Sequence, residues 1–300
     1  MTPSRVLVAG ANGQLGGVIV RKLAAAGIPV RALGRDAQKL RSFSGTAGVE
    51  IAPVDMMNLA ALTEACRGVE QIVSTANNNM GKGATSPAKI DLTAHQNLCA
   101  AARKAGVRRL LYVSAAGIDQ DSPVDVFRIK WYIEDAIRRS GVPYVIVRPS
   151  AFMDIWVDQI LADGIRRKGV ATVFGPGTAR SNYIAVEDVA EFVVKIVGRD
   201  EVVNEAIEIG GPTTMSMNEV ATLVEKQLGR GGRRRHIPVF AMKLLPPVIR
   251  LFDERTARLM TFGYFATEDH PLPAWEKAAE RFSVQPRTLE EYVATLDRRG

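Results

Sequence analysis

Residues 6–17 read VLVAGANGQLGG. The first four are apolar and predict a short buried β-strand, and the stretch from Gln14 onward predicts a helix. Gly10, Gly13 and Gly16 recur at three-residue spacing across the junction. The first permits a tight turn off the strand, the second lets backbone amides approach a phosphate group, and the third lets the helix pack close to the sheet. The pattern therefore predicts a Rossmann-type dinucleotide-binding loop, with the pyrophosphate at the helix N-terminus.

Short apolar strands alternate with longer helical patterns from residue 5 to residue 148. The predicted strands are Arg5–Ala9, Val30–Leu33, Glu50–Pro53, Gln71–Thr75, Arg109–Ser114 and Tyr144–Arg148. The predicted helices between them are Gln14–Ala26, Ala37–Phe43, Leu59–Cys66, Ala88–Ala105 and Val124–Ser140. This alternation is typical of an α/β fold in which a doubly wound parallel sheet carries helices on both faces. We therefore expect a dinucleotide-binding Rossmann domain over residues 1–150.

The rhythm changes after Arg148. Pro149 and two glycine–proline stretches, residues 175–177 and 210–212, separate helices from short strands such as Ala171–Phe174 and Ala206–Ile209. This second half does not easily extend the first sheet. We expect residues 151–300 to form a smaller α/β lobe on the substrate side, closely packed on the first domain.

The end of the second strand bears on which dinucleotide binds. Residues 30–36 read VRALGRD, so Arg35 stands where NAD-preferring domains commonly carry an acid. A guanidinium suits the 2′-phosphate of NADP, with Arg31 as an assisting candidate, so we expect NADP(H) rather than NAD(H). The alternative for Arg35 is an ordinary surface charge. Asp55, after the third strand, is either a contact on the adenine side or the N-cap of the helix that begins near Leu59.

Further cofactor contacts are expected from the loop itself and from the end of the fourth strand. Asn12, Gln14 and Leu15 complete the glycine-rich loop. Ala76 and Asn77 directly follow the fourth strand, where the carboxyl ends of parallel strands form the binding crevice. We expect these two residues beside the nicotinamide half. An ordinary flexible loop is the alternative for the polar run that Asn77 begins.

The composition of the 300 residues argues against several other classes. The net charge is +7, but the basic residues are dispersed and the densest run, Arg230–Arg235, has no aromatic residues for base stacking, so no nucleic acid is expected. Cys66 and Cys99 lack metal-ligand neighbours, which predicts reduced core thiols and no metal. The N-terminus shows no signal-peptide pattern, and the apolar stretch Val239–Phe252 is too short to span a bilayer. We expect a cytoplasmic protein in which that stretch covers a pocket or lies on a membrane surface.

Four stretches together resemble the NmrA-like group of atypical short-chain dehydrogenases/reductases. They are GANGQLGG at residue 10, RALGRD at 31, KAGVRRLLYVSAAG at 104 and GVPYVIVRPSAFMD at 141. NYIAVEDVAEFV and QPRTLEEYV extend the resemblance more faintly over nearly the whole chain. The group includes isoflavone-reductase-like enzymes, triphenylmethane reductase, NAD(P)H-sensing regulators and the nucleotide-binding accessory subunit of respiratory complex I. The resemblance implies a Rossmann fold that binds a nicotinamide dinucleotide.

The resemblance also implies candidate catalytic residues. Short-chain reductases carry a serine at the end of the fifth strand and a Tyr-x-x-x-Lys pair on the next helix, where the lysine ammonium lowers the tyrosine pKa and holds the nicotinamide ribose. Ser114 and Lys130 occupy the corresponding places, but the tyrosine position is Val126. Tyr132 lies two residues past Lys130 and points to nearly the opposite side of a helix. The protein therefore either transfers hydride without that phenol or does no chemistry. Lys130 anchors the ribose in both cases, unless it is a solvent-facing lysine.

The substrate side is expected to be apolar. Phe152 and Met153, directly after the sixth strand, join Tyr183 and the segment Phe240–Phe252 as candidate pocket residues, with simple core residues as the alternative. Such walls suit a small quinone, aromatic ketone or activated alkene. His270 is a further proton-donor candidate that no motif supports. Two functions follow: an NADPH-dependent reductase of a small, largely apolar carbonyl, quinone or enone, or a non-catalytic NADP(H)-binding redox sensor or accessory subunit with a protein partner.

Overall fold

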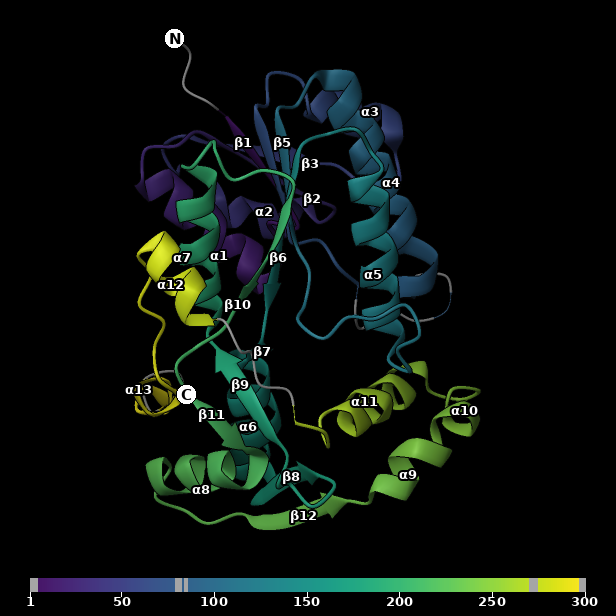
Figure 1. Cartoon of the computed structure of the whole chain (residues 1–300), viewed down its shortest axis with the longest axis vertical. Helices are drawn as coiled ribbons and strands as arrows, with labels where there is room; N and C mark the ends of the chain where they lie inside the picture. The colour runs from purple at the N-terminus through teal and green to yellow at the C-terminus, as the bar shows by residue number, and fades with distance from the viewer. Residues whose placement is uncertain (1–4, 79–82, 84–85, 270–274, 297–300) are drawn as a thin grey trace. The chain divides into compact units, whose positions relative to one another are not determined.

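The computed structural model describes residues 5–78, 83, 86–269 and 275–296 (Figure 1). The chain divides into two compact units. The first consists of Met1–Arg148 and Val189–Ile207, and the second of Pro149–Asp188 and Glu208–Gly300. The first unit thus takes in a segment from beyond residue 150, which differs from the boundary expected from the sequence.

A seven-stranded sheet forms the centre of the first unit. Its strands lie in the order β10-β6-β5-β4-β1-β2-β3, and the pairings from β6 to β3 are all parallel. This order confirms the doubly wound Rossmann-type fold. The strands are β1 (Val6–Ala9), β2 (Val30–Gly34), β3 (Val49–Pro53), β4 (Gln71–Ser74), β5 (Arg109–Val113), β6 (Tyr144–Pro149) and β10 (Glu205–Ile209). Each predicted strand up to β6 agrees with the observed one to within one residue at either end.

Helices cover both faces of this sheet (Figure 1). On one face α3 (Leu59–Ala65), α4 (Pro87–Ala105) and α5 (Asp125–Arg138) share a continuous buried core with the strands. The other helices are α1 (Gln14–Ala25), α2 (Ala37–Leu40), which continues into a 3₁₀ turn at Arg41–Phe43, and α7 (Val186–Val197). Lys22 on α1 pairs with Glu191 on α7 at 2.7 Å. Helices therefore cover the faces of the sheet, and parallel sheets of this kind bind their ligands at the carboxyl ends of the strands.

The strand predicted at Ala206–Ile209 exists, but its expected place in the second lobe is wrong. It is β10, the strand next to β6 at the edge of the first sheet. The backbone amide of Asn204 donates to the Tyr144 carbonyl oxygen at 2.6 Å just before β10 begins. A strand pattern in a sequence does not specify which strand it pairs with. Consecutive strands usually pair, so a strand that returns to the sheet after a long intervening segment is assigned to the wrong sheet.

The second unit contains two small sheets and most of the remaining helices. β9 (Arg180–Ile184) lies between β7 (Ala151–Phe152) and β11 (Thr214–Ser216), and β8 (Val170–Phe174) pairs in parallel with β12 (Arg233–Ile237). A π-helix (Asp154–Ala162) leads into α6 (Asp163–Lys168). The other helices are α8 (Met217–Gln227), α9 (Val239–Leu244), α10 (Pro246–Ile249), α11 (Glu254–Phe265), α12 (Trp275–Phe282) and α13 (Leu289–Val293).

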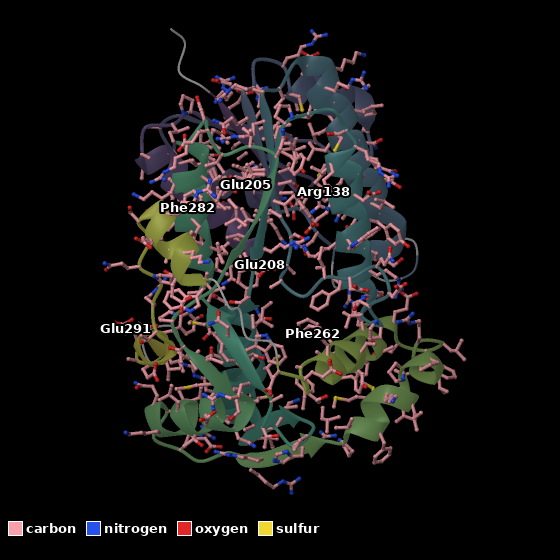
Figure 2. All side chains as sticks on the ribbon, viewed as in Figure 1. Arg138, Glu205, Glu208, Phe262, Phe282 and Glu291 are labelled. Carbon is pink, nitrogen blue, oxygen red and sulfur yellow. The ribbon has the colours of Figure 1, made fainter. Side chains whose placement is uncertain are left out.

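The second unit has its own apolar core. Trp156 stacks on Phe262, with ring centroids 5.4 Å apart, and makes an edge contact with Phe174 at 5.9 Å (Phe262 is labelled in Figure 2). Aromatic contacts of Trp156 therefore join the π-helix to α11 on one side and to β8 on the other. Within the described residues, no helix has the length and apolar character that crossing a membrane requires.

Candidate functional site

The loop after β1 is shaped by two glycines that have no room for a side chain. Gly10 has φ +87°, and a Cβ there would lie 2.7 Å from the amide nitrogen of Ala76. A Cβ at Gly16 would lie 2.2 Å from the Gly10 carbonyl oxygen. Real atoms do not approach this closely, so only glycine fits at either position. The loop is therefore drawn tightly against the end of β4, which brings together Gly10 and Ala76, two of the residues predicted to hold the cofactor.

The N-terminus of α1 has the features of an anion-binding helix end. Gly13 is the N-cap and offers no side chain, and the first turn contains no acidic residue. Gly13 and Gln14 are exposed and Leu15 is half-buried. Beside them the Asn12 side-chain oxygen is buried and has no hydrogen-bond partner among the described residues. Unpaired amides at a helix end attract a phosphate, and an orphaned acceptor is satisfied by a ligand hydroxyl or amide, so these residues fit a dinucleotide.

The two arginines considered for cofactor choice, Arg31 and Arg35, have different environments in the structure. Arg35 is exposed directly after the strand. Arg31 instead is buried, donates to both oxygens of Glu50 at 2.9 and 3.0 Å, and also donates to the Ala65 carbonyl oxygen at 2.6 Å. Its guanidinium is therefore taken up within the fold and does not assist Arg35. Asp36, next to Arg35, accepts from the amides of Gln38 and Lys39 as the N-cap of α2.

Asp55 has a clear local role after β3. Its carboxylate accepts the backbone amide of Met57 at 2.9 Å, and the side chain is exposed. Asn58 is the N-cap of α3, with its side-chain oxygen accepting from the Ala61 amide at 3.1 Å. The capping alternative for Asp55 is therefore wrong, because the cap lies three residues later. The adenine-side contact stays a prediction.

The segment after β4 lies against the glycine loop and is held by hydrogen bonds. The Thr75 hydroxyl donates to the Ala9 carbonyl oxygen at 3.3 Å, which ties β4 to the glycine loop. The exposed side-chain amide of Asn77 donates to the Thr75 carbonyl oxygen at 3.2 Å. The backbone amide of Asn78 donates to a carboxylate oxygen of Asp91 at the start of α4. These bonds fix the chain up to Asn78, so Ala76 and Asn77 are held in place beside Gly10.

Lys130 points inward from α5 rather than toward solvent. Only 9% of the residue is exposed, and the ammonium donates to the Val113 carbonyl oxygen at 3.3 Å and the Tyr112 hydroxyl at 3.4 Å. The solvent-facing alternative is therefore wrong. Burial lowers the lysine pKa to about 8, although the carboxylates of Asp91 and Glu134 oppose that shift. An ammonium with such a pKa is mostly charged at neutral pH and gives up its proton readily.

Three polar residues that the sequence analysis did not single out form a chain of contacts that begins at Lys130. The Tyr112 ring lies against the imidazole of His95 at 5.0 Å between centroids, and the His95 Nε2 lies 3.0 Å from the Ser74 hydroxyl. The other ring nitrogen of His95 lies 2.7 Å from the Asp91 carbonyl oxygen. We call Ser74, His95, Tyr112 and Lys130 the Lys130 cluster. All four are buried, at or near the ends of β4 and β5 or on the helices that cover them.

The positions of the cluster residues explain why they were missed. Tyr112 lies two residues before Ser114 in β5, and alternation along a strand places both side chains on the same face of the sheet. That spacing is a usable signal for Tyr112. His95 offers no signal, because a lone histidine in a helical pattern does not indicate which strand end it faces. Burial raises the pKa of the Tyr112 phenol well above its ordinary value, so it is not an acid at neutral pH.

Ser114 lies beside a buried ion-pair group. Glu134 is fully buried and pairs with Arg138 and Arg148 at 2.7 Å each, and these arginines hold its pKa below the ordinary value (Arg138 is labelled in Figure 2). The Ser114 hydroxyl also lowers that pKa, yet it forms no hydrogen bond of ordinary geometry with a described residue. Ser114 therefore lies at the end of β5 with its hydroxyl directed at the Glu134 carboxylate. Tyr132 is exposed and faces away from Lys130, as its spacing predicts.

The predicted substrate residues all belong to the second unit. Met153 and Tyr183 are buried in its core, and Phe152 is half-buried in β7. Burial raises the pKa of Tyr183 above its ordinary value, which removes it as an acid at neutral pH. These features favour the core alternative for Met153 and Tyr183. His270 lies outside the described residues. Among the described residues, no three His, Cys, Asp or Glu side chains gather as metal ligands, and Cys66 and Cys99 are free and buried.

The sheet order and the glycine loop define an NAD(P)-binding protein of the Rossmann type. More narrowly, the chain belongs to the NmrA-like family, whose profile matches residues 2–293. The resemblance inferred from the sequence is thereby confirmed.

Several of the relatives with curated descriptions are reductases. A (4-alkanoyl-5-oxo-2,5-dihydrofuran-3-yl)methyl phosphate reductase from Streptomyces griseus subsp. griseus is 32% identical over 263 residues, which cover 85% of this chain and 87% of that protein. An NAD(P)H azoreductase from Xenophilus azovorans is 29% identical over 75% of this chain and 74% of its own. Among solved structures, an NADPH-dependent quinone oxidoreductase from Escherichia coli, complexed with NADPH, has a TM-score of 0.79 at 19% identity, covering 97% of this chain and 99% of that one.

Proposed function

We propose that this protein is an NADPH-dependent reductase of a small, largely apolar carbonyl, quinone or enone, and that Lys130 supplies the proton. The observation that carries the proposal is the Lys130 ammonium, held among buried polar groups at the carboxyl ends of β4 and β5 with a pKa of about 8. Parallel α/β sheets bind their ligands at this edge. The reductase relatives support the class of reaction.

The chemistry divides between the cofactor and the chain. NADPH, when bound, supplies a hydride to the electrophilic carbon of the substrate. The ammonium of Lys130 donates a proton to the substrate oxygen, and the resulting amine is reprotonated from solvent. Ser114 orients that oxygen by turning its hydroxyl from Glu134 toward the substrate. The Tyr112 hydroxyl and the Val113 carbonyl oxygen accept hydrogen bonds from the Lys130 ammonium and hold it in position. Because the lysine supplies the proton, the reaction does not depend on a phenol at position 126.

The non-catalytic alternative is supported by Val126, which stands where active short-chain reductases carry a tyrosine. Two measurements on the same protein distinguish it from the proposal. NADPH binding is measured by calorimetric titration, and turnover by the loss of NADPH absorbance with a panel of quinones, enones and aromatic ketones. We expect both. Tight NADPH binding with no oxidation across the panel would instead identify a redox sensor or accessory subunit.

The role of Lys130 is tested with Lys130→Met and Lys130→Arg. We expect kcat to fall by about 100-fold in both variants, because neither side chain donates a proton at neutral pH. The arginine variant keeps the charge, so its KM for NADPH should change less than that of the methionine variant. In the wild type, kcat should fall as the pH rises through about 8, where the ammonium is lost. Lys104→Met, an exposed lysine on α4, is the matched control. A change in KM alone in Lys130→Met would reduce Lys130 to a cofactor anchor.

A further inference from the structure

The segment from α9 to the start of α11 exposes an unusual amount of apolar side chain. The five most exposed large hydrophobic residues of the described chain all lie between positions 240 and 252. Phe252 is 87% and Leu251 79% exposed, and Phe240, Leu244 and Val248 are each more than half exposed. Isolated exposed hydrophobics are common, but a contiguous set marks an interaction surface. We call these five residues the apolar face.

The apolar face follows helical spacing across two short helices. Phe240, Leu244, Val248 and Leu251 recur every three or four residues, so they line one side even though the pair Pro246–Pro247 interrupts the helix. A second apolar stripe, Met242 and Pro246, is buried on the opposite side. α11 packs back against both α9 and α10, as the ribbon in Figure 1 shows. The fold therefore already satisfies one stripe and leaves the other without a partner.

The charged residues within the segment of the apolar face are both cationic, and the acidic residues Asp253 and Glu254 follow it at the start of α11. Residues 239–252 include Lys243 and Arg250 and no acidic residue. Both cations are exposed, and neither forms an ion pair with a described residue. Arg233 and Arg235, on the adjoining strand β12, are exposed as well. Large apolar side chains flanked by lysine and arginine are the composition of a helix that lies in the plane of an anionic membrane surface.

We infer that residues 239–252 dock the protein onto an anionic lipid surface, with Phe240, Leu251 and Phe252 inserted at the headgroup boundary. A second copy of the chain fits this face less well. A two-fold interface would bring the same cations together on a chain with net charge +7, and the nearest acid, Asp253, is already engaged as the N-cap of α11. An anionic bilayer satisfies both the apolar and the cationic groups at once.

The test is flotation of the full-length protein with phosphatidylcholine vesicles and with vesicles containing phosphatidylglycerol. We expect binding to the anionic vesicles only, weakened by high salt. The double variant Leu251→Ser/Phe252→Ser should lower the partition coefficient at least about tenfold, and Lys243→Glu/Arg250→Glu should do likewise. Tyr132→Ser/Val203→Ser and Lys168→Glu/Lys226→Glu change exposed residues elsewhere and should bind as the wild type does.

Three results would overturn the inference. If the wild type does not float with the anionic vesicles, the protein does not bind a lipid surface. If it binds neutral vesicles equally well, the proposed preference for anionic lipid is wrong. Self-association in analytical ultracentrifugation that Leu251→Ser/Phe252→Ser abolishes, without vesicle binding, would assign the face to a second copy. Thermal melting of each variant confirms that it is folded. None of these readouts requires turnover, so they are independent of the proposed reductase activity.

Discussion

The glycine loop and the Lys130 cluster lie at the ends of neighbouring strands of one sheet, but the sequence encodes them in opposite ways. The loop is a single stretch in which the absence of side chains at Gly10 and Gly16 lets backbone approach backbone. The cluster consists of four side chains gathered from two strands and two helices. The glycine loop is therefore encoded by one local stretch, whereas the proposed proton donor depends on contacts between distant parts of the chain.

Replacing Gly16 should have the largest effect of the substitutions considered, on both NADPH affinity and stability. In Gly16→Ala the new Cβ meets the Gly10 carbonyl, so the loop opens, NADPH binding falls by at least about 100-fold and stability falls by about 1–3 kcal/mol. The adjacent Gly17→Ala places its Cβ 3.5 Å from the Ala11 carbonyl oxygen, an ordinary contact within α1. That control should keep its affinity and gain up to about 1 kcal/mol from helix propensity. Titration calorimetry and thermal melting measure both; equal behaviour of the two variants would contradict the close-approach argument.

The same contrast between local and long-range features explains which parts of the structure could be predicted from the sequence. The strand and helix bounds up to β6 were predictable because each element has its own apolar period and its own turn residues. The glycine loop was predictable for the same local reason. Ser74 and His95 were not, because nothing in their neighbourhoods shows that the fold brings them near Lys130, whereas Tyr112 could be inferred only from its two-residue spacing to Ser114.

Long-range pairing limited the prediction elsewhere too. The pattern of β10 is plain in the sequence, but its place beside β6 depends on a chain that leaves the first unit and returns. Arg31 is a comparable case for side chains. Its charge suggested a cofactor contact, whereas Glu50 and the Ala65 carbonyl from other segments bind it.

The buried histidine of the Lys130 cluster makes stability depend on acid pH. Burial lowers the His95 pKa from 6.5 to about 4, so the unfolded chain takes up a proton before the folded one does. Protonation between these values favours unfolding, and the free energy of unfolding should fall by about 2 kcal/mol from pH 7 to pH 5 through this group. Urea unfolding of the wild type and His95→Gln at both pH values isolates the contribution, which the variant should lack. His236→Gln, at an exposed histidine, should retain it; the same loss in His95→Gln as in the wild type would show that other groups cause the acid sensitivity.

Cofactor choice is the smallest effect and depends on one side chain beside the backbone loop. Arg35 is exposed at the end of β2, free of the contacts that engage Arg31, so its guanidinium is available to the 2′-phosphate of NADP. Arg35→Glu should weaken NADPH binding by about tenfold or more through charge repulsion and leave NADH binding nearly unchanged. Titration of both dinucleotides into the wild type, Arg35→Glu and the nearby surface variant Lys39→Glu gives the ratio directly. If NADPH and NADH lose affinity equally in Arg35→Glu, the side chain acts on the loop as a whole and does not read the phosphate. If only NADPH loses affinity, the Arg35 side chain determines which dinucleotide is preferred, while the glycine loop binds the part that both dinucleotides share.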